Sequence, residues 1–353
     1  MAAVCVILSS LAASQRQASA QAKGSYRNPV LFADYSDPDV IRDGNNYYLI
    51  SSSFGFVPGI PILQSNDLVH WTIIGHVLPR IELDPRYDMV GGNRYGRGAW
   101  APSLRKHNGL FYVYFPTPDE GIFVSTAAKI TGPWSKPVAV IAQAALEDPC
   151  PFWDDDGKAY LVHSMKGAGP LILHRMAPDG KSVLDEGKEI VRDPQNLPTL
   201  EGPKLYKRNG YYYIFAPFGG VGTGSQVVLR ARSIYGPYEH RVVLHQGDTK
   251  INGPHQGGYV ESQDGKDGLS TSSPAARTVE STTWSRCAGR MTGRLWVTRR
   301  RAPPWASPSA HGPSRIIQAK TPISVHRLQT SSARRNWGHS GSGTIILTMR
   351  TGP

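Results

Sequence analysis

The chain has 353 residues, and its hydrophobic fraction of 40% is enough for the core of one large domain or two average ones. The formal net charge of +12 would suit a nucleic-acid partner, but residues 265–353 hold 14 Lys or Arg against 2 Asp or Glu, while residues 1–264 carry no net charge. No apolar run approaches the roughly 18–20 residues of a membrane span. We therefore expect neither a membrane nor a nucleic-acid partner.

The first 20 residues have the pattern of a secretory signal peptide. An apolar stretch at residues 4–8 is followed by small residues and by Ala18-Ser19-Ala20, a pattern that precedes cleavage. The usual basic segment is missing, so a mispredicted start is the alternative. We expect residues 1–20 to be removed and the protein to be secreted. The remaining Cys150 and Cys287 are too few for a disulfide framework, and we interpret Cys150 as a small packing residue.

Five segments between residues 37 and 265 share one pattern: a short strand that begins near a proline, a polar turn and an aromatic-rich strand. They begin at Asp37, Trp100, Asp148, Glu201 and Gly253, at intervals of 63, 48, 53 and 52 residues. Each predicts a β-hairpin, because Asp-Gly, Asn-Gly or Gly-Asn joins the two runs. A β-sandwich would explain the alternation but not the repeat of about 50 residues, which is typical of propeller blades. We predict an all-β, five-bladed β-propeller.

Acidic residues head three of the predicted innermost strands, at what we expect to be the same position of each blade: Asp37, Asp148 and Glu201. A propeller would bring them together at its central channel. Unpaired buried carboxylates cost several kcal/mol, so three around one axis indicate a site rather than a requirement of the fold. The alternative is that Asp-Pro and Glu-Gly merely begin turns. Converging carboxyls suit the cleavage of glycosidic bonds, which needs one ionised carboxylate and one proton donor.

Aromatic side chains accompany these acids. Phe54, Phe56 and Trp100 would supply the apolar faces on which sugar rings stack. The alternative for each of them is packing between blades. We predict that all three belong to a substrate-binding surface.

The phrases resemble glycoside hydrolase family 43, five-bladed propellers that include β-xylosidases and α-L-arabinofuranosidases. Four of them are Ser36-Asp37-Pro38-Asp39, Glu147-Asp148-Pro149, Glu201-Gly202-Pro203 and Gly253-Pro254-His255, and the others lie at residues 28–31, 56–60, 65–71 and 100–102. The resemblance covers residues 26–267. The phrase at residues 65–71 is typical of the branch that acts on xylose or arabinose.

The resemblance implies a role for each acid. Asp37 is expected to be the general base that activates water, Asp148 the residue that tunes and orients the donor, and Glu201 the general acid. The family inverts anomeric configuration, so base and acid should stand roughly 6.5–9.5 Å apart. His255 resembles an axial histidine that contacts a calcium or chloride ion indirectly in some members; the alternative is a packing histidine. We expect no required cofactor and no direct metal ligand, with calcium as the possible structural ion.

The composition changes after Asp267, where the aromatic hairpin of a fifth blade does not follow and Ser, Thr, Arg and Pro dominate without a strand or helix period. Back-translating residues 274–280 and reading two nucleotides along permits Arg-Gly-Ala-Tyr-Gly-Arg, a phrase that the family carries here and that supplies a sugar-binding arginine. Residues 290–297 and 340–349 permit two further family phrases in the same frame. We infer a frameshift near residue 267, a propeller over residues 26–267 with an incomplete fifth blade, and an irregular tail over residues 268–353.

The leading interpretation is an inverting exo-glycosidase that hydrolyses xylose- or arabinose-containing oligosaccharides from plant cell walls. A carbohydrate-binding propeller without turnover is the alternative, because the fifth blade is expected to be incomplete. Nucleic-acid binding through the basic tail is a third and disfavoured interpretation. The sequence chooses neither between xylose and arabinose nor among oligomeric states.

Overall fold

The computed structural model describes residues 26, 28–247, 253–276 and 279–286. The expected signal peptide and residues 287–353 of the expected tail lie outside these ranges. The described residues form nineteen β-strands and one short 3-10 helix, Pro85–Asp88. No helix in these ranges is long and apolar enough to cross a membrane.

Antiparallel strands form four sheets of four strands and one sheet of three, each a meander of consecutive strands. The first sheet contains β1 (Asp39–Asp43), β2 (Asn46–Ile50), β3 (Gly59–Ser65) and β4 (Thr72–Leu78). The second contains β5 (Ser103–His107), β6 (Leu110–Thr117), β7 (Gly121–Ala127) and β8 (Val138–Ile141). The third contains β9 (Leu146–Trp153), β10 (Ala159–Met165), β11 (Leu171–Met176) and β12 (Lys188–Val191). The fourth contains β13 (Lys204–Arg208), β14 (Tyr211–Phe218), β15 (Ser225–Ala231) and β16 (Glu239–Leu244). The three-stranded sheet contains β17 (His255–Glu261), β18 (Asp267–Ala276) and β19 (Val279–Arg286).

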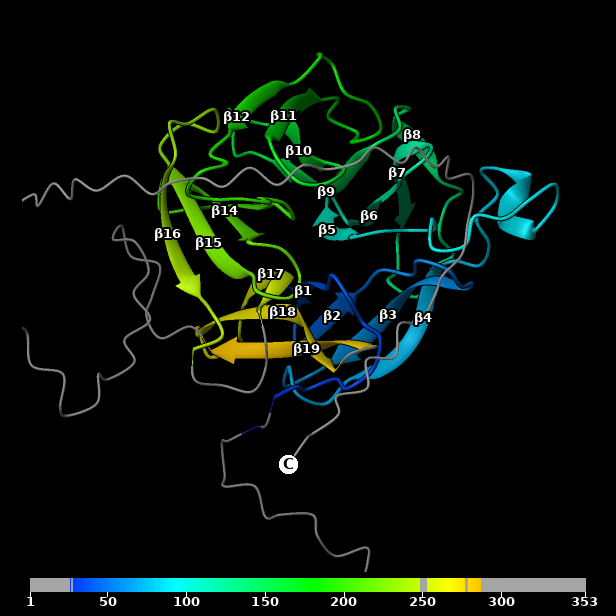
Figure 1. The fold of residues 1–353 in the computed structure, drawn as a ribbon, viewed down its shortest axis with the longest axis horizontal. Helices are drawn as coiled ribbons and strands as arrows, with labels where there is room; N and C mark the ends of the chain where they lie inside the picture. Colours follow the sequence, from blue (N-terminus) through cyan, green and yellow to red (C-terminus); the bar gives the residue numbers. More distant parts are fainter. Residues whose placement is uncertain (1–25, 27, 248–252, 277–278, 287–353) are drawn as a thin grey trace, which may run out of the picture. The chain divides into compact units, whose positions relative to one another are not determined.

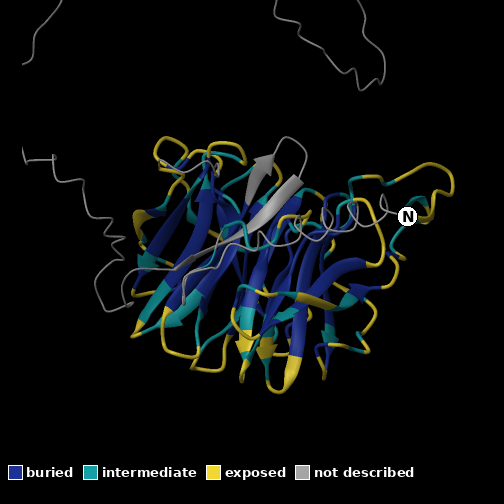
Figure 2. Ribbon diagram, turned by 90° about the horizontal axis from the view of Figure 1, so that it is seen from below, coloured by how far each residue is buried: buried dark blue, intermediate teal, exposed yellow. Residues whose placement is uncertain are grey.

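The sheets are arranged radially, with the first strand of each sheet at the centre (Figure 1). Contacts join β1 to β5, β5 to β9, β9 to β13 and β13 to β17, and β17 returns to β1. The fold is therefore the all-β propeller that the repeat predicted. The central strands are buried and the turns at the strand ends are exposed (Figure 2).

Hydrophobic clusters fill the space between neighbouring sheets. Ile50 and Ile60 of the first sheet pack with Leu104 of the second, and Val40 packs with Val260 where the last sheet meets the first. Burial of such side chains stabilises the fold by about 1.5–3 kcal/mol each. Ring closure thus depends on side chains that are more than 200 residues apart in the sequence.

The predicted hairpins are confirmed at the innermost pairs of strands. At Asn108-Gly109 and Asn209-Gly210 both turn residues have positive φ, from 47° to 78°. A two-residue turn of this kind matches the twist of the flanking strands and favours Asn-Gly. Each turn returns the chain from a central strand to an aromatic strand in its own sheet.

The strands continue past residue 267, which differs from the boundary expected from composition. β18 pairs with β17 from Asp267 onward, and β19 extends the sheet to Arg286. Ser270, Thr271 and Ser272 are buried. Backbone groups make the ladder hydrogen bonds, so a strand in which most of the buried side chains are polar escapes a search for apolar alternation.

Candidate active site

A proline at the start of each innermost strand sets the position of the acids. Asp37 and Asp148 each directly precede such a proline, and their φ values of 52° and 58° lie in the left-handed region, which Asp enters more readily than most residues. In the fourth sheet Gly202 takes this place, with φ of 56°, and Glu201 stands one residue earlier. Asp37 and Asp148 are therefore equivalent, but Glu201 is not, which corrects the expectation of one shared position.

Three donors hold the Asp148 carboxylate. Its Oδ2 accepts hydrogen bonds from Ser164 Oγ at 2.6 Å and from the Gly202 backbone N–H at 2.8 Å. Its Oδ1 accepts one from Gln256 Nε2 at 2.8 Å. These donors come from the third, fourth and fifth sheets in turn, so the orientation of Asp148 depends on closure of this half of the ring.

Asp37 has a similar support within its own sheet. Ser52 Oγ donates a hydrogen bond to Asp37 Oδ2 at 2.6 Å. Ser52 follows β2, just as Ser164 lies at the end of β10, so each second strand returns a serine to the acid that heads its first strand. The sequence analysis missed both serines and Gln256, because a lone Ser or Gln carries no motif that distinguishes it.

His255 lies between the carboxyls of Asp37 and Glu201. Its Nε2 lies 3.0 Å from Glu201 Oε1, and its Nδ1 lies 4.0 Å from Asp37 Oδ1. The ring is only 3% exposed. One imidazole ring between the two carboxyls keeps their nearest oxygens within the roughly 9.5 Å upper limit for an inverting pair. Asp37, Glu201 and His255 thus meet at one mouth of the channel, which we call the acidic mouth.

A fourth carboxyl belongs to the acidic mouth. Oxygens of Glu147, Asp148 and Glu201 all lie within 4.8 Å of one another. The pKa of Glu147 is raised to about 7, first by burial and then by the neighbouring Asp148 and Glu201 charges, against the lowering effect of the Gly167 backbone N–H and Lys166. The sequence analysis missed Glu147 as a site residue, although it stands beside Asp148 in a phrase that carried the resemblance.

Two of the three predicted aromatic residues are in contact. The rings of Phe54 and Trp100 meet edge to face with centroids 5.9 Å apart, and Trp100 Nε1 donates to the Gly96 carbonyl at 3.0 Å. Phe56 is 50% exposed and lines, with Phe54, a cavity of about 420 Å³. Trp100 stands two residues before a proline, as Glu201 does.

Two cationic side chains, Lys204 and Arg105, link innermost strands of different sheets. Lys204 is fully buried, and its Nζ reaches from β13 to β5, where Ser103 Oγ lies at 2.9 Å and the Pro102 carbonyl at 3.3 Å. Arg105 donates to Asp39 Oδ2 at 2.7 Å. A lysine between two sheets that are not neighbours places positive charge close to the channel axis.

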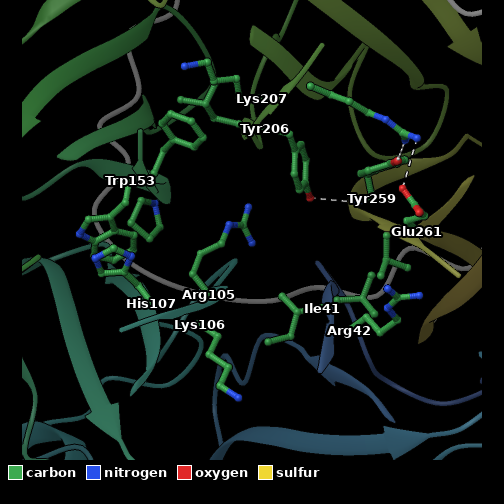
Figure 3. Close-up of a pocket in the computed structure, with 16 residues that line it drawn as sticks. Ile41, Arg42, Arg105, Lys106, His107, Trp153, Tyr206, Lys207, Tyr259 and Glu261 are labelled. Atoms are coloured by element: carbon green, nitrogen blue, oxygen red, sulfur yellow. Dashed lines mark hydrogen bonds and ion pairs between the residues drawn. The ribbon is translucent and has the colours of Figure 1, made fainter. Parts of the chain in front are cut away.

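The ends of the innermost strands surround a different cavity, of about 530 Å³. His107, Trp153, Arg208 and Glu261, the last residues of β5, β9, β13 and β17, all line it. Figure 3 shows Arg105 pointing into the middle of this cavity. Since the acids lie at the strand starts, they and this cavity occupy opposite ends of the channel.

A calcium ion reached through His255 fits the described residues poorly. Calcium prefers six to eight oxygen ligands, but both ring nitrogens of His255 face carboxylates at 3.0 and 4.0 Å. The carboxyls able to meet on one ion are Glu147, Asp148 and Glu201, a group without His255. The buried Lys204 adds positive charge in the channel, which disfavours a divalent cation.

Two carboxyls that face each other at one mouth of a propeller, within the separation of an inverting pair, suit the cleavage of glycosidic bonds. The family model of the glycosyl hydrolases family 43 matches residues 26–290. The chain belongs to this family.

Individual relatives agree with this assignment. A protein of Xylanibacter ruminicola, provisionally named a β-xylosidase, is 53% identical over 245 residues, which cover 69% of this chain and 45% of the relative. A non-reducing end α-L-arabinofuranosidase of Bacteroides ovatus is 36% identical over 223 residues, covering 62% and 41%. The crystal structure of a xylan β-1,4-xylosidase from Bacillus halodurans superposes with a TM-score of 0.66 at 28% identity, covering 76% of this chain and 55% of that one. The chain spans about half the length of the curated relatives it matches.

Proposed function

We propose that this chain is an inverting exo-glycosidase that hydrolyses xylose- or arabinose-containing oligosaccharides from plant cell walls. The observation that carries the proposal is the position of Asp37 and Glu201 on the two ring nitrogens of His255. A general base and a general acid must flank the scissile bond with room for one water between the base and the sugar. The acidic mouth provides two such carboxyls on rigid strand starts.

The reaction needs one proton transfer at each carboxyl. Glu201, in its protonated form, donates a proton to the leaving oxygen as the bond from that oxygen to the anomeric carbon breaks. Asp37 accepts a proton from the water whose oxygen forms the new bond on the opposite face, which inverts the configuration. Asp148, held by three donors beside Glu201, orients the acid.

The choice of xylose or arabinose is supported by the relatives. A β-xylosidase of Formosa agariphila and the Bacteroides arabinofuranosidase are 37% and 36% identical to the chain. Phe54 and Trp100, in contact with each other, supply an apolar surface for a sugar ring. We include secretion through residues 1–20 in the proposal, because the substrate is extracellular.

We also propose that β17, β18 and β19 form an incomplete fifth blade. The other sheets have four strands, whereas this one has three in the part of the chain that the structure covers. Its contacts with β1 and β13 support a place between the first and fourth blades. A frameshift near residue 267 would account for a sheet with three strands among the described residues and for the basic composition that follows.

Hydrolysis of 4-nitrophenyl β-xyloside and 4-nitrophenyl α-arabinofuranoside tests the function. We expect one of them to be hydrolysed, and NMR to show the inverted anomer as the first product. Asp37→Ala and Glu201→Ala should each lower kcat by roughly 10²–10⁴-fold. Azide should rescue only the first, because it needs no base, and a good leaving group should favour only the second.

Two results would count against this proposal. A chain that binds xylobiose but releases no sugar would be the carbohydrate-binding alternative. Wild-type turnover of xylobiose by both variants would show that the acids are wrongly assigned.

A further inference from the structure

Glu147 occupies in the third sheet the place that Glu201 occupies in the fourth. Both residues stand two positions before a proline, which is Pro149 within β9 for Glu147 and Pro203 just before β13 for Glu201. The same place holds Ser36 in the first sheet and Trp100 in the second. Glu147 is thus a second glutamate with the backbone position of the expected general acid, one sheet away from it.

Glu147 lies inside the acidic mouth and faces charged groups from several elements. It is 7% exposed, and its carboxyl lies within 4.8 Å of those of Asp148 and Glu201. Lys166, just after β10, and the Gly167 backbone N–H also face it. The Asp148 charge also interacts with His163 of β10, and His255 of β17 contacts Glu201. Asp148 and Glu201 are therefore the negative charges that act most directly on Glu147.

Carboxyls this close and this buried do not all ionise together. Each negative charge disfavours the ionisation of the next, and burial adds to the cost. Lys166 is a cation that opposes this effect at Glu147, but its influence is smaller than that of Asp148 or Glu201. The three carboxyls should consequently retain a proton at pH values where an isolated glutamate has lost it.

We propose that Glu147 is a positioning residue that acts through Glu201 and keeps the general acid protonated at neutral pH. This inference rests on the proposed function of Glu201. Glu201 loses its proton to the leaving oxygen in each turnover and regains one from solvent. The charge of Glu147 makes the ionised form of Glu201 unfavourable, which speeds this return and extends activity to higher pH.

Matched variants separate this role from simple packing. Glu147→Gln keeps the shape but removes the charge, whereas Glu147→Asp keeps the charge and serves as the control. For xylobiose, whose leaving group needs a proton, the alkaline limb of kcat/KM should move to lower pH by about one unit or more in Glu147→Gln. It should stay near the wild-type position in Glu147→Asp. For 2,4-dinitrophenyl β-xyloside, whose leaving group needs no proton, the limb should not move in either variant.

The inference would be overturned if the alkaline limb of kcat/KM for xylobiose lay at the same pH in wild type and in Glu147→Gln. An equal shift with both substrates would also overturn it, because the effect would not pass through the acid.

Proton binding is measured separately by infrared difference spectra between pH 6 and pH 9. Wild type should show a protonated carboxyl band at pH 6 that Glu147→Gln has lost. A band present in both forms would show that Glu147 does not control proton retention. If no form hydrolyses any substrate, the proposed function fails, and the infrared spectra still decide whether the charge of Glu147 keeps a carboxyl of this group protonated.

Discussion

His255 Nε2 lies 3.0 Å from Glu201 Oε1 across the acidic mouth. The histidine heads β17 and the glutamate precedes β13, so this contact joins the three-stranded sheet to the fourth sheet at the acid side of the site. A buried histidine leaves the Glu201 side chain fewer orientations than solvent would. The fifth sheet therefore contributes directly to the geometry of the expected proton donor.

Replacing His255 should affect substrates that need a proton more than substrates that do not. We expect His255→Ala to lower kcat for xylobiose by about 10- to 150-fold, the cost of one hydrogen bond to a charged group. His255→Gln, which retains a donor, should lose less. The 2,4-dinitrophenyl substrate should change little. The exposed His240→Gln is the control, and an equal loss on both substrates would contradict a role through Glu201.

The serines behind the two aspartates should matter for catalysis. Ser52→Ala and Ser164→Ala each remove a 2.6 Å hydrogen bond to a buried carboxylate. Each should lower kcat/KM by about 10- to 150-fold, because bonds to charged groups are worth ~1.5–3 kcal/mol. Steady-state kinetics check this, with the exposed Ser233→Ala expected to stay within about twofold of wild type. Wild-type kinetics in both variants would show that the carboxylates need no such support.

Chelation should leave the protein unchanged. The carboxyls able to share an ion exclude His255, and Lys204 holds a buried ammonium in the channel. We expect dialysis against EDTA to alter neither Tm nor kcat/KM, and added calcium chloride to restore nothing. Sodium chloride at equal ionic strength is the control. Loss of activity on chelation that calcium alone reverses would show that the site takes a metal after all.

The His163–His174 pair should make stability depend on pH. His163 Nε2 lies 3.0 Å from His174 Nε2, and burial lowers the pKa of His163 to about 4. The unfolded chain binds this proton near pH 6.5, so the folded state loses stability as pH falls from about 6.5 to about 4, by up to roughly 3 kcal/mol. Urea unfolding at pH 7 and pH 4.5 measures it. His163→Gln should flatten this dependence, whereas His240→Gln should retain the wild-type slope; an unchanged slope in His163→Gln would place the effect elsewhere.

Local sequence patterns were enough to predict much of the fold. Asn-Gly turns and aromatic alternation predicted hairpins that the structure contains, because both depend on residues close in sequence. The repeat of about 50 residues predicted a propeller for the same reason. The strand β18 was missed, since Ser270 and Thr271 are buried without being apolar.

The residue types at the acidic mouth are a property of the sequence alone: an acid one or two residues before a proline, near the start of three innermost strands, is visible without coordinates. The sequence does not reveal which of these residues are in contact, because the contacts form between sheets that meet only when the ring closes. The one-residue offset of Glu201, the approach of Glu147 and the position of His255 between two carboxyls arise from left-handed backbone at Asp148 and Gly202 and from packing across the channel. The sequence determines that carboxyls stand near the strand starts. Closure of the ring brings them close enough for their charges to interact, and this interaction affects their protonation.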